Sequence, residues 1–166
     1  MSLIPNVDNG SGAFIGGFKA IASFYSTQNQ LMTGGPAIPI LFDTQTPGIT
    51  PVDVVLNNIT GEMTFNRTGI YKITVDITFS LTVPGPAGLA SWLTINGTSV
   101  PVSFRTHNID QNPPQSAFHE WFVPILIGDI LTIDIGSSAG PTTVFVVFPP
   151  PIPDLPSAVV NILQID

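Results

Sequence analysis

Cysteine is absent from this sequence of 166 residues, and basic residues are scarce. Without cysteine, disulfide bonds, thiolate metal sites and thiol nucleophiles are excluded. Lys and Arg together number 4 against 11 Asp and Glu, which gives a formal net charge of −7. Binding to nucleic acid or to an anionic membrane needs clustered Lys and Arg side chains. The sequence therefore predicts no nucleic-acid partner and no adhesion to such a membrane.

Charge of either sign is also rare, and long apolar runs are missing. Charged residues make up 9% of the chain and hydrophobic residues 43%, whereas an average soluble domain carries about 25% charged residues. So few charges indicate that part of the surface is buried in an oligomer. No apolar run reaches the roughly 20 residues that a membrane-spanning helix needs, so we expect no membrane insertion.

The organising feature of the sequence is an alternating run that follows Gly69. From Ile73 to Val83 every odd position is apolar and every even position is polar. This period of two is typical of a long strand with one face on a core. Turn-forming residues at 66–69 separate it from a shorter strand that ends at Phe65.

Turn residues divide the rest of the chain into short apolar runs, with 15 Gly and 17 Pro as punctuation. We count about ten short strands and no helical period, a pattern that favours a jelly roll. The predicted fold class is all-β, a ten-stranded antiparallel jelly-roll sandwich over residues 18–166. Residues 1–17 are expected to be a flexible lead-in or attachment segment. We further expect one strand over 98–105 and a polar loop over 107–115.

Four features occur in order along the chain. They are Gly61-x-x-x-Phe65 with Gly69-Ile70-Tyr71, then Leu93-x-Ile95-Asn96-Gly97, then Val123-x-Ile125-x-x-Gly128-Asp129-x-Leu131, and finally an apolar last strand. Together they resemble the C1q/TNF-like jelly-roll superfamily. In that family the first motif opens the long strand of the inner sheet.

Other features depart from the animal members of this superfamily. The loop 136–156 is long and proline-rich, cysteine is missing, and Asn161 stands where the family has a small glycine. The chain therefore resembles a microbial or viral member, similar to the head domains of spore-surface collagen-like glycoproteins.

Two strands are apolar on both faces, which bears on assembly. In the strand 116–127, matching Val123 and Ile125 to the family's core positions turns Trp121 inward. In the last strand, Val160 and Ile162 oppose Val159 and Leu163. The resemblance implies a homotrimer, and the candidates for its interface are Phe118, Glu120, Phe122, Leu126, Val160 and Ile162. An open alternative is that a loop around 149–153 covers these faces within one chain.

The polar face of the long strand carries Lys72, Thr74, Asp76, Thr78 and Ser80. On the family's arrangement this face looks toward the threefold axis, with Lys72 paired to Asp76 of a neighbour. Simple exposure to solvent is the alternative.

Residues that could support catalysis or bind metal are few. The two histidines are His107, expected to be solvated in a loop, and His119, expected to be partly buried. His119 and Glu120 point to opposite faces of a strand, so they cannot share a site. No Gly-x-Ser-x-Gly motif and no closely spaced pair of metal-ligating histidines occurs. We therefore predict no enzymatic activity, no catalytic residue and no cofactor, with a calcium site assembled from loops as an open alternative.

The sequence thus favours a non-enzymatic, homotrimeric head or knob domain. The expected setting is extracellular or the exposed surface of a virion or spore, where apical loops contact a protein or carbohydrate receptor. A soluble trimeric lectin and a capsid or cement protein are the alternatives.

Overall fold

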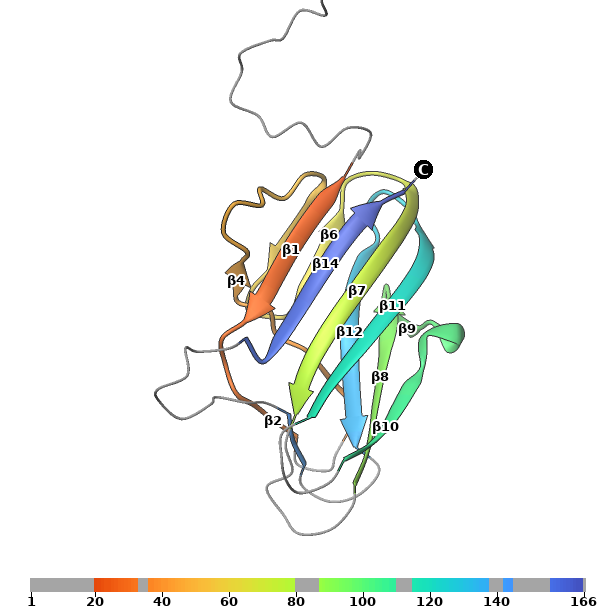
Figure 1. Cartoon of the computed structure of the whole chain (residues 1–166). Helices are drawn as coiled ribbons and strands as arrows, with labels where there is room; N and C mark the ends of the chain where they lie inside the picture. The colour runs from red at the N-terminus through yellow and green to blue at the C-terminus, as the bar shows by residue number, and fades with distance from the viewer. Residues whose placement is uncertain are drawn as a thin grey trace, which may run out of the picture.

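The computed structural model describes residues 20–32, 36–79, 87–109, 115–137, 142–144 and 156–165. These residues form two antiparallel sheets that lie face to face (Figure 1). The segment 1–17 and the loop around 149–153 lie outside the described residues. Within the described ranges, no helix is long and apolar enough to cross a membrane.

The first sheet has five strands in the order β11-β7-β14-β1-β4. Its strands are β1 (Ile21–Ser26), β4 (Thr44–Gln45), β7 (Gly69–Phe79), β11 (Gln115–Ile125) and β14 (Ala158–Gln164). Every neighbouring pair is antiparallel, and β7 pairs with β11 along the full length of both strands.

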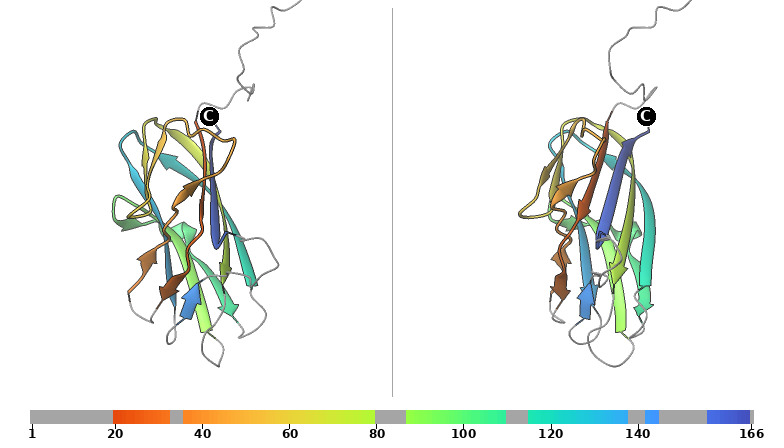
Figure 2. Two further views of the ribbon diagram at one scale, coloured as in Figure 1. Left: turned by 90° about the vertical axis from the view of Figure 1, so that its left-hand side faces the viewer. Right: turned by 60° about the vertical axis from the view of Figure 1, so that its left-hand side comes forward.

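The second sheet follows the order β10-β8-β12-β6-β5, with β3 added to β12 and β9 added to β8. Its strands are β3 (Ile38–Pro39), β5 (Val54–Asn57), β6 (Glu62–Phe65), β8 (Ala87–Ile95), β9 (Thr98–Ser99), β10 (Arg105–Ile109) and β12 (Ile130–Ser137). A separate pair joins β2 (Gln30–Met32) to β13 (Thr142–Val144). Figure 2 shows the layers from the side. The prediction of an all-β antiparallel sandwich is confirmed.

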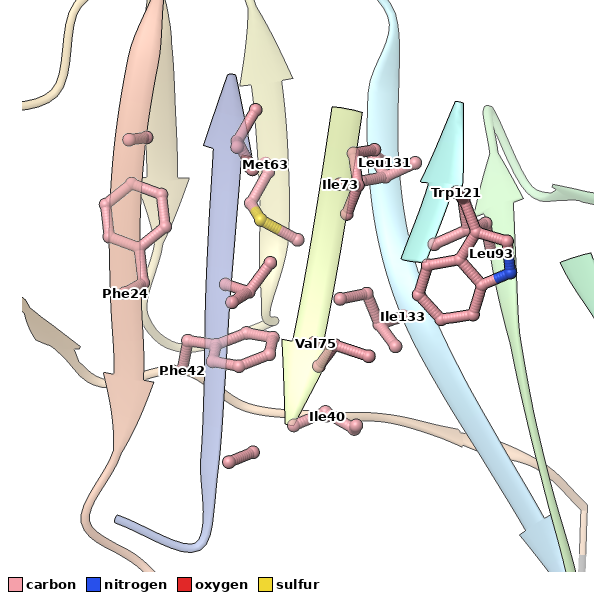
Figure 3. Close-up of a cluster of buried hydrophobic side chains, with 14 of the residues drawn as sticks. Phe24, Ile40, Phe42, Met63, Ile73, Val75, Leu93, Trp121, Leu131 and Ile133 are labelled. Carbon is pink, nitrogen blue, oxygen red and sulfur yellow. The ribbon is translucent and has the colours of Figure 1, made fainter. Parts of the chain in front are cut away.

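The core lies between the two sheets and follows from strand alternation. On β7, Tyr71, Ile73, Val75, Ile77 and Phe79 are almost fully buried, while the residues between them face away from the core. Side chains of the second sheet meet them, including Met63, Leu93, Leu131 and Ile133 (Figure 3). The alternation predicted from Ile73 onward is therefore confirmed up to Phe79, where the described part of this strand ends.

Two glycines of the sequence motifs are required by the backbone. Gly61 has φ of +74°, and a Cβ atom there would lie 2.3 Å from the carbonyl oxygen of Ile40. Gly97 follows Asn96 in the hairpin between β8 and β9, and both residues have positive φ, +50° at Asn96 and +75° at Gly97. Positive φ at both central residues is the geometry of a type I′ turn, as an Asn-Gly pair favours.

The segment after this hairpin differs from the prediction of one strand over 98–105. β9 is only two residues long, and a 3₁₀ turn over Pro101–Ser103 follows it. Pro101 has no backbone N–H to donate to a ladder, and the Ser103 hydroxyl stabilises the turn by donating to the Val100 carbonyl, 2.7 Å away. The chain then enters β10, so the predicted loop at 107–115 is wrong for its first three residues and also for Gln115, where β11 begins.

Candidate functional site

The first sheet has one face on the core and one face that no described residue covers. We call the second the open face; it is formed by outward side chains of β11, β7, β14 and β1. Its large apolar members on β11 are Phe118 and Phe122, which are 64% and 57% exposed. Leu126, just past the end of β11, is 62% exposed. These exposed apolar groups make the open face the candidate interaction surface of this chain.

Strand pairing decides which side of β14 belongs to the open face. Directly paired residues lie on the same face of a sheet, and Val160 pairs with the buried Val75 while Ile162 pairs with the buried Ile73. Val160 and Ile162 are accordingly buried in the core, at 0% and 1% exposure. Their prediction as interface residues is wrong.

The open face of β14 carries the other apolar pair. Val159 pairs with Asp76 and Leu163 pairs with Lys72, both of which point away from the core. Both faces of β14 carry apolar residues. The sequence therefore offers no wholly polar face that would fix the orientation of this strand. Only the pairing with β7 resolves it.

The charged residues of the open face interact within the chain. Lys72 forms a salt bridge with Glu120 at 2.6 Å, and its Nζ atom lies 5.9 Å from the centre of the Phe122 ring. The structure thus gives Lys72 a partner on its own chain. Both side chains are more than a third exposed, so the pair contributes little to stability in the isolated chain.

Asp76 occupies a different environment on the same face. Phe118 of β11 and Val159 of β14 are its partners on the two sides. Burial desolvates the Asp76 carboxyl and raises its pKa. Neither salt bridge of the described residues includes Asp76, so its charge lies among apolar groups without a cationic partner there.

The two histidines are brought together at the opposite edge of the sandwich from β4. His107 on β10 and His119 on β11 have their Nε2 atoms 3.0 Å apart. The prediction that His107 is a solvated loop residue is wrong, because it is a half-buried strand residue paired with another imidazole. His119 is buried while Glu120 faces outward, as expected from their adjacent positions on one strand.

Burial lowers the pKa of His107, and it lowers that of His119 to about 4, helped by the nearby His107 and Arg105. Both rings are therefore neutral at neutral pH, and one Nε2–H donates to the other Nε2. Among the described residues, no Ser, Asp or Glu side chain hydrogen-bonds to either ring, so they do not form a triad with a nucleophile and an acid. Nor do three His, Asp or Glu side chains of these residues gather where they could hold a metal ion.

Comparison with known proteins bears on the fold. No family model matches the chain, and no curated protein sequence does. The structure of Eiger TNF from S. frugiperda is similar, with a TM-score of 0.62 and 14% identity over 88% of this chain and 92% of that one. Murine APRIL, crystallised at pH 5.0, gives a TM-score of 0.54 and 12% identity over 88% of this chain and 98% of the other.

The fold is a C1q/TNF-like jelly roll. At such low identity the likeness concerns the fold, which was predicted from the four sequence motifs, and leaves function to the site itself. In this C1q/TNF-like sandwich, the surface that stands out is the open face of the first sheet.

Proposed function

We propose that this chain is a non-enzymatic recognition domain that assembles as a homotrimer through its open face. It serves as a head or knob on an extracellular surface, such as that of a spore, phage or virus, and contacts a protein or carbohydrate receptor. The observation that carries the proposal is the row of exposed Phe118, Phe122 and Leu126 along β11 in a chain with only 9% charged residues.

Exposed apolar groups on a sheet face favour association, because burial removes them from water. On the open face they lie beside the partly buried Lys72–Glu120 pair and the desolvated Asp76. A closed ring of three chains covers this face in every copy, so no open face stays exposed to nucleate aggregates. The likeness to TNF-type folds supports this choice of symmetry.

The position of the chain ends favours display. The backbone N–H of Gln164 donates to the backbone carbonyl of Ala20, with 3.0 Å between the nitrogen and the oxygen. Both described ends of the chain therefore lie at the same end of the sandwich (Figure 1). An attachment at residues 1–17 would therefore leave the far end of the sandwich free for a partner. The proposal of a non-enzymatic role rests on the likeness to TNF-type folds.

Light scattering of the purified chain tests the assembly. We expect a mass about three times the 17.6 kDa of one chain, unchanged on dilution to low micromolar concentration. Phe118→Glu should give folded monomers, because it places a charge in the apolar contact of all three chains. Val55→Glu, at a residue of similar exposure on β5 of the other sheet, is the matched control and should stay trimeric.

A wild-type monomer, or dissociation by Val55→Glu but not by Phe118→Glu, would contradict the proposed interface. Assembly of the purified chain into particles much larger than a trimer would favour the capsid or cement alternative instead.

A further inference from the structure

A hollow lies on the second sheet, away from the open face. It is a pocket of about 460 Å³, within the size range of small-molecule sites. Its lining comes from the start of β8, the middle of β10, the end of β12 and the residue before β3, and includes Gly88, Ala90, Trp92, Thr106, Asn108 and Gly136. Because β12 ends and β8 begins there, the pocket lies at the end of the sandwich far from the C-terminus (Figure 1).

We propose that this pocket binds the ring of a neutral saccharide, with Trp92 as the aromatic wall and Thr106 and Asn108 as the polar rim. The inference deepens the recognition role proposed above, by giving it a ligand class and a site. Three properties of the pocket carry it: its floor of small residues, its rigid aromatic wall and its lack of charge.

Small residues lie side by side in the lining of the pocket. Gly136 on β12 pairs with Ala90 on β8, and Gly88 on the same strand pairs with Asn108 on β10. These residues alternate with Leu89 and Ser91, which are buried toward the core. The small side chains therefore form the floor of the pocket on the outer face of the sheet, where bulkier ones would fill it.

The wall is an indole held in one orientation. Trp92 stacks on Phe104 with ring centres 4.9 Å apart and planes 14° apart. A Cβ atom on Gly136 would lie 3.2 Å from Cη2 of Trp92, so the absence of a side chain there lets the indole lie over β12. The indole N–H is buried and has no hydrogen-bond partner among the described residues. A ligand oxygen that reaches it would recover the free energy lost by leaving that donor unpaired.

The pocket carries no formal charge, although the chain as a whole has a net charge of −7. His107 also borders the pocket, but its imidazole points to the other side of β10 toward His119 and is neutral because burial lowers its pKa. A charged ligand would therefore find no opposite charge in the lining. The rim offers the hydroxyl of Thr106 and the amide of Asn108, both exposed, which donate and accept hydrogen bonds as sugar hydroxyls require.

A pyranose ring combines the two properties that this lining matches. Its C–H groups carry a small positive charge and pack on the negative face of an aromatic ring, while its hydroxyls bind amides and hydroxyls. The pocket faces away from the open face, so it stays accessible in the proposed trimer. Three copies on one particle would then bind a multivalent glycan surface with avidity.

The experiment titrates the ¹⁵N-labelled full chain with glucose, galactose, mannose, fucose, N-acetylglucosamine and N-acetylgalactosamine, each up to tens of millimolar. The chain has 2 tryptophans and therefore two indole N–H signals. At least one sugar should shift the Trp92 signal saturably, with a dissociation constant of about 1–10 mM, as expected for a one-ring ligand. The signal of Trp121, which is buried and donates to the Ser103 carbonyl, serves as the internal control and should not move.

Two variants test the site by different routes. Gly136→Val fills the floor, and Asn108→Ala removes a rim amide that is exposed and therefore dispensable for folding. Each should weaken binding at least tenfold, as expected for the loss of one good contact. Asn66→Ala, an exposed amide in the hairpin before β7, is the control and should bind as the wild type does.

Three results would overturn the proposal: no sugar of the panel moves the Trp92 signal, the shift survives in both pocket variants, or sialic or glucuronic acid binds better than every neutral sugar. Because a monosaccharide occupies one pocket of one chain, this test does not depend on assembly. A monomer that binds sugar would contradict the trimer alone, and a trimer that binds none would contradict the pocket alone.

Discussion

His107 and His119 face each other between the edges of the two sheets, with their Nε2 atoms 3.0 Å apart. The ring of Phe79 lies 6.0 Å from that of His107, and the ring of Trp121 lies 5.4 Å from that of His119. The pair thus joins β10 to β11 in an aromatic environment. A neutral pair can form this contact with one Nε2–H as the donor, whereas two imidazolium rings would both donate and would repel each other.

The first prediction is that the histidine pair makes stability depend on pH. The folded pKa of His119 is lowered to about 4 from 6.5, so between these values the unfolded chain binds more protons than the folded chain. The free energy of unfolding should therefore rise with pH across that window and be lost as the pH falls from about 6.5 to about 4, by roughly 1–3 kcal/mol. Urea unfolding measured at several pH values gives the slope.

The control for this prediction is His119→Gln, whose amide can still hydrogen-bond to His107 but does not titrate. Its free energy of unfolding should vary much less over the same range. The positive charge of Arg105 also lowers the pKa of His119, but by less than burial does. Arg105→Gln should therefore reduce the slope only slightly. An equal slope in the wild type and in His119→Gln would contradict the assigned cause.

Asp76 gives a second prediction, of opposite sign. Desolvation raises its pKa above the ordinary value of 3.8, so the folded chain holds this proton more tightly than the unfolded chain. The stability that it contributes is present below pH 3.8 and is lost as the pH rises through the folded pKa. Asp76→Asn should therefore raise the melting temperature at neutral pH and leave it unchanged in strong acid.

The neighbouring Thr74→Val variant separates this electrostatic effect from a gain in apolar surface. It lies on the same face of β7 but changes no charge, so any shift in its melting temperature should be the same at both pH values. A pH-independent effect of Asp76→Asn would show that its charge is not the cause.

Much of the fold could be predicted because the local pattern and the tertiary environment agree. One conformation satisfies both the local pattern and the tertiary environment at three places. They are the alternating strand β7, the glycine at position 61 and the Asn96-Gly97 turn. By contrast, β11 has apolar residues on both faces, so the inward position of Trp121 could be predicted only by matching Val123 and Ile125 to the core positions of the family that the chain resembles.

Other features depend on partners far away in the sequence. Residues 105–108 contain no apolar side chain that would mark a strand, yet β10 forms because it pairs with β8. This long-range pairing brings His107 to His119 and lines the pocket beside Trp92. The orientation of β14 is likewise set by its pairing with β7, since Val159 and Val160 are equally apolar.

A third prediction compares two glycines with nearly equal φ, +74° at Gly61 and +75° at Gly97. Ala at either position has to adopt this unfavourable backbone conformation, at a cost of about 1 kcal/mol. At Gly97 the added methyl group meets open space, whereas at Gly61 it would lie 2.3 Å from the Ile40 carbonyl oxygen. Gly61→Ala should therefore lower the free energy of unfolding by clearly more than Gly97→Ala does. Equal losses in chemical denaturation would show that the strand around Ile40 moves away at no cost.

The last prediction separates core from open face on a single strand. Trp121 is 4% exposed and its neighbour Phe122 is 57% exposed, because successive residues of a strand point to opposite faces. Trp121→Ala removes a core side chain and the hydrogen bond from its indole Nε1 to the Ser103 carbonyl, 2.9 Å away. It should lower the free energy of unfolding by roughly 3–5 kcal/mol and impair folding of the chain itself.

Phe122→Glu should act on assembly instead. Its side chain takes no part in the core, so circular dichroism should still show a β-rich chain, while light scattering should show monomers. Its melting temperature should also fall, because the stability of an obligate trimer includes its association. The decisive comparison is the oligomeric state of the two variants. If Phe122→Glu stays trimeric while Trp121→Ala gives folded monomers, the two faces of β11 have been exchanged, since a shift of one residue in register reverses every side chain on the strand.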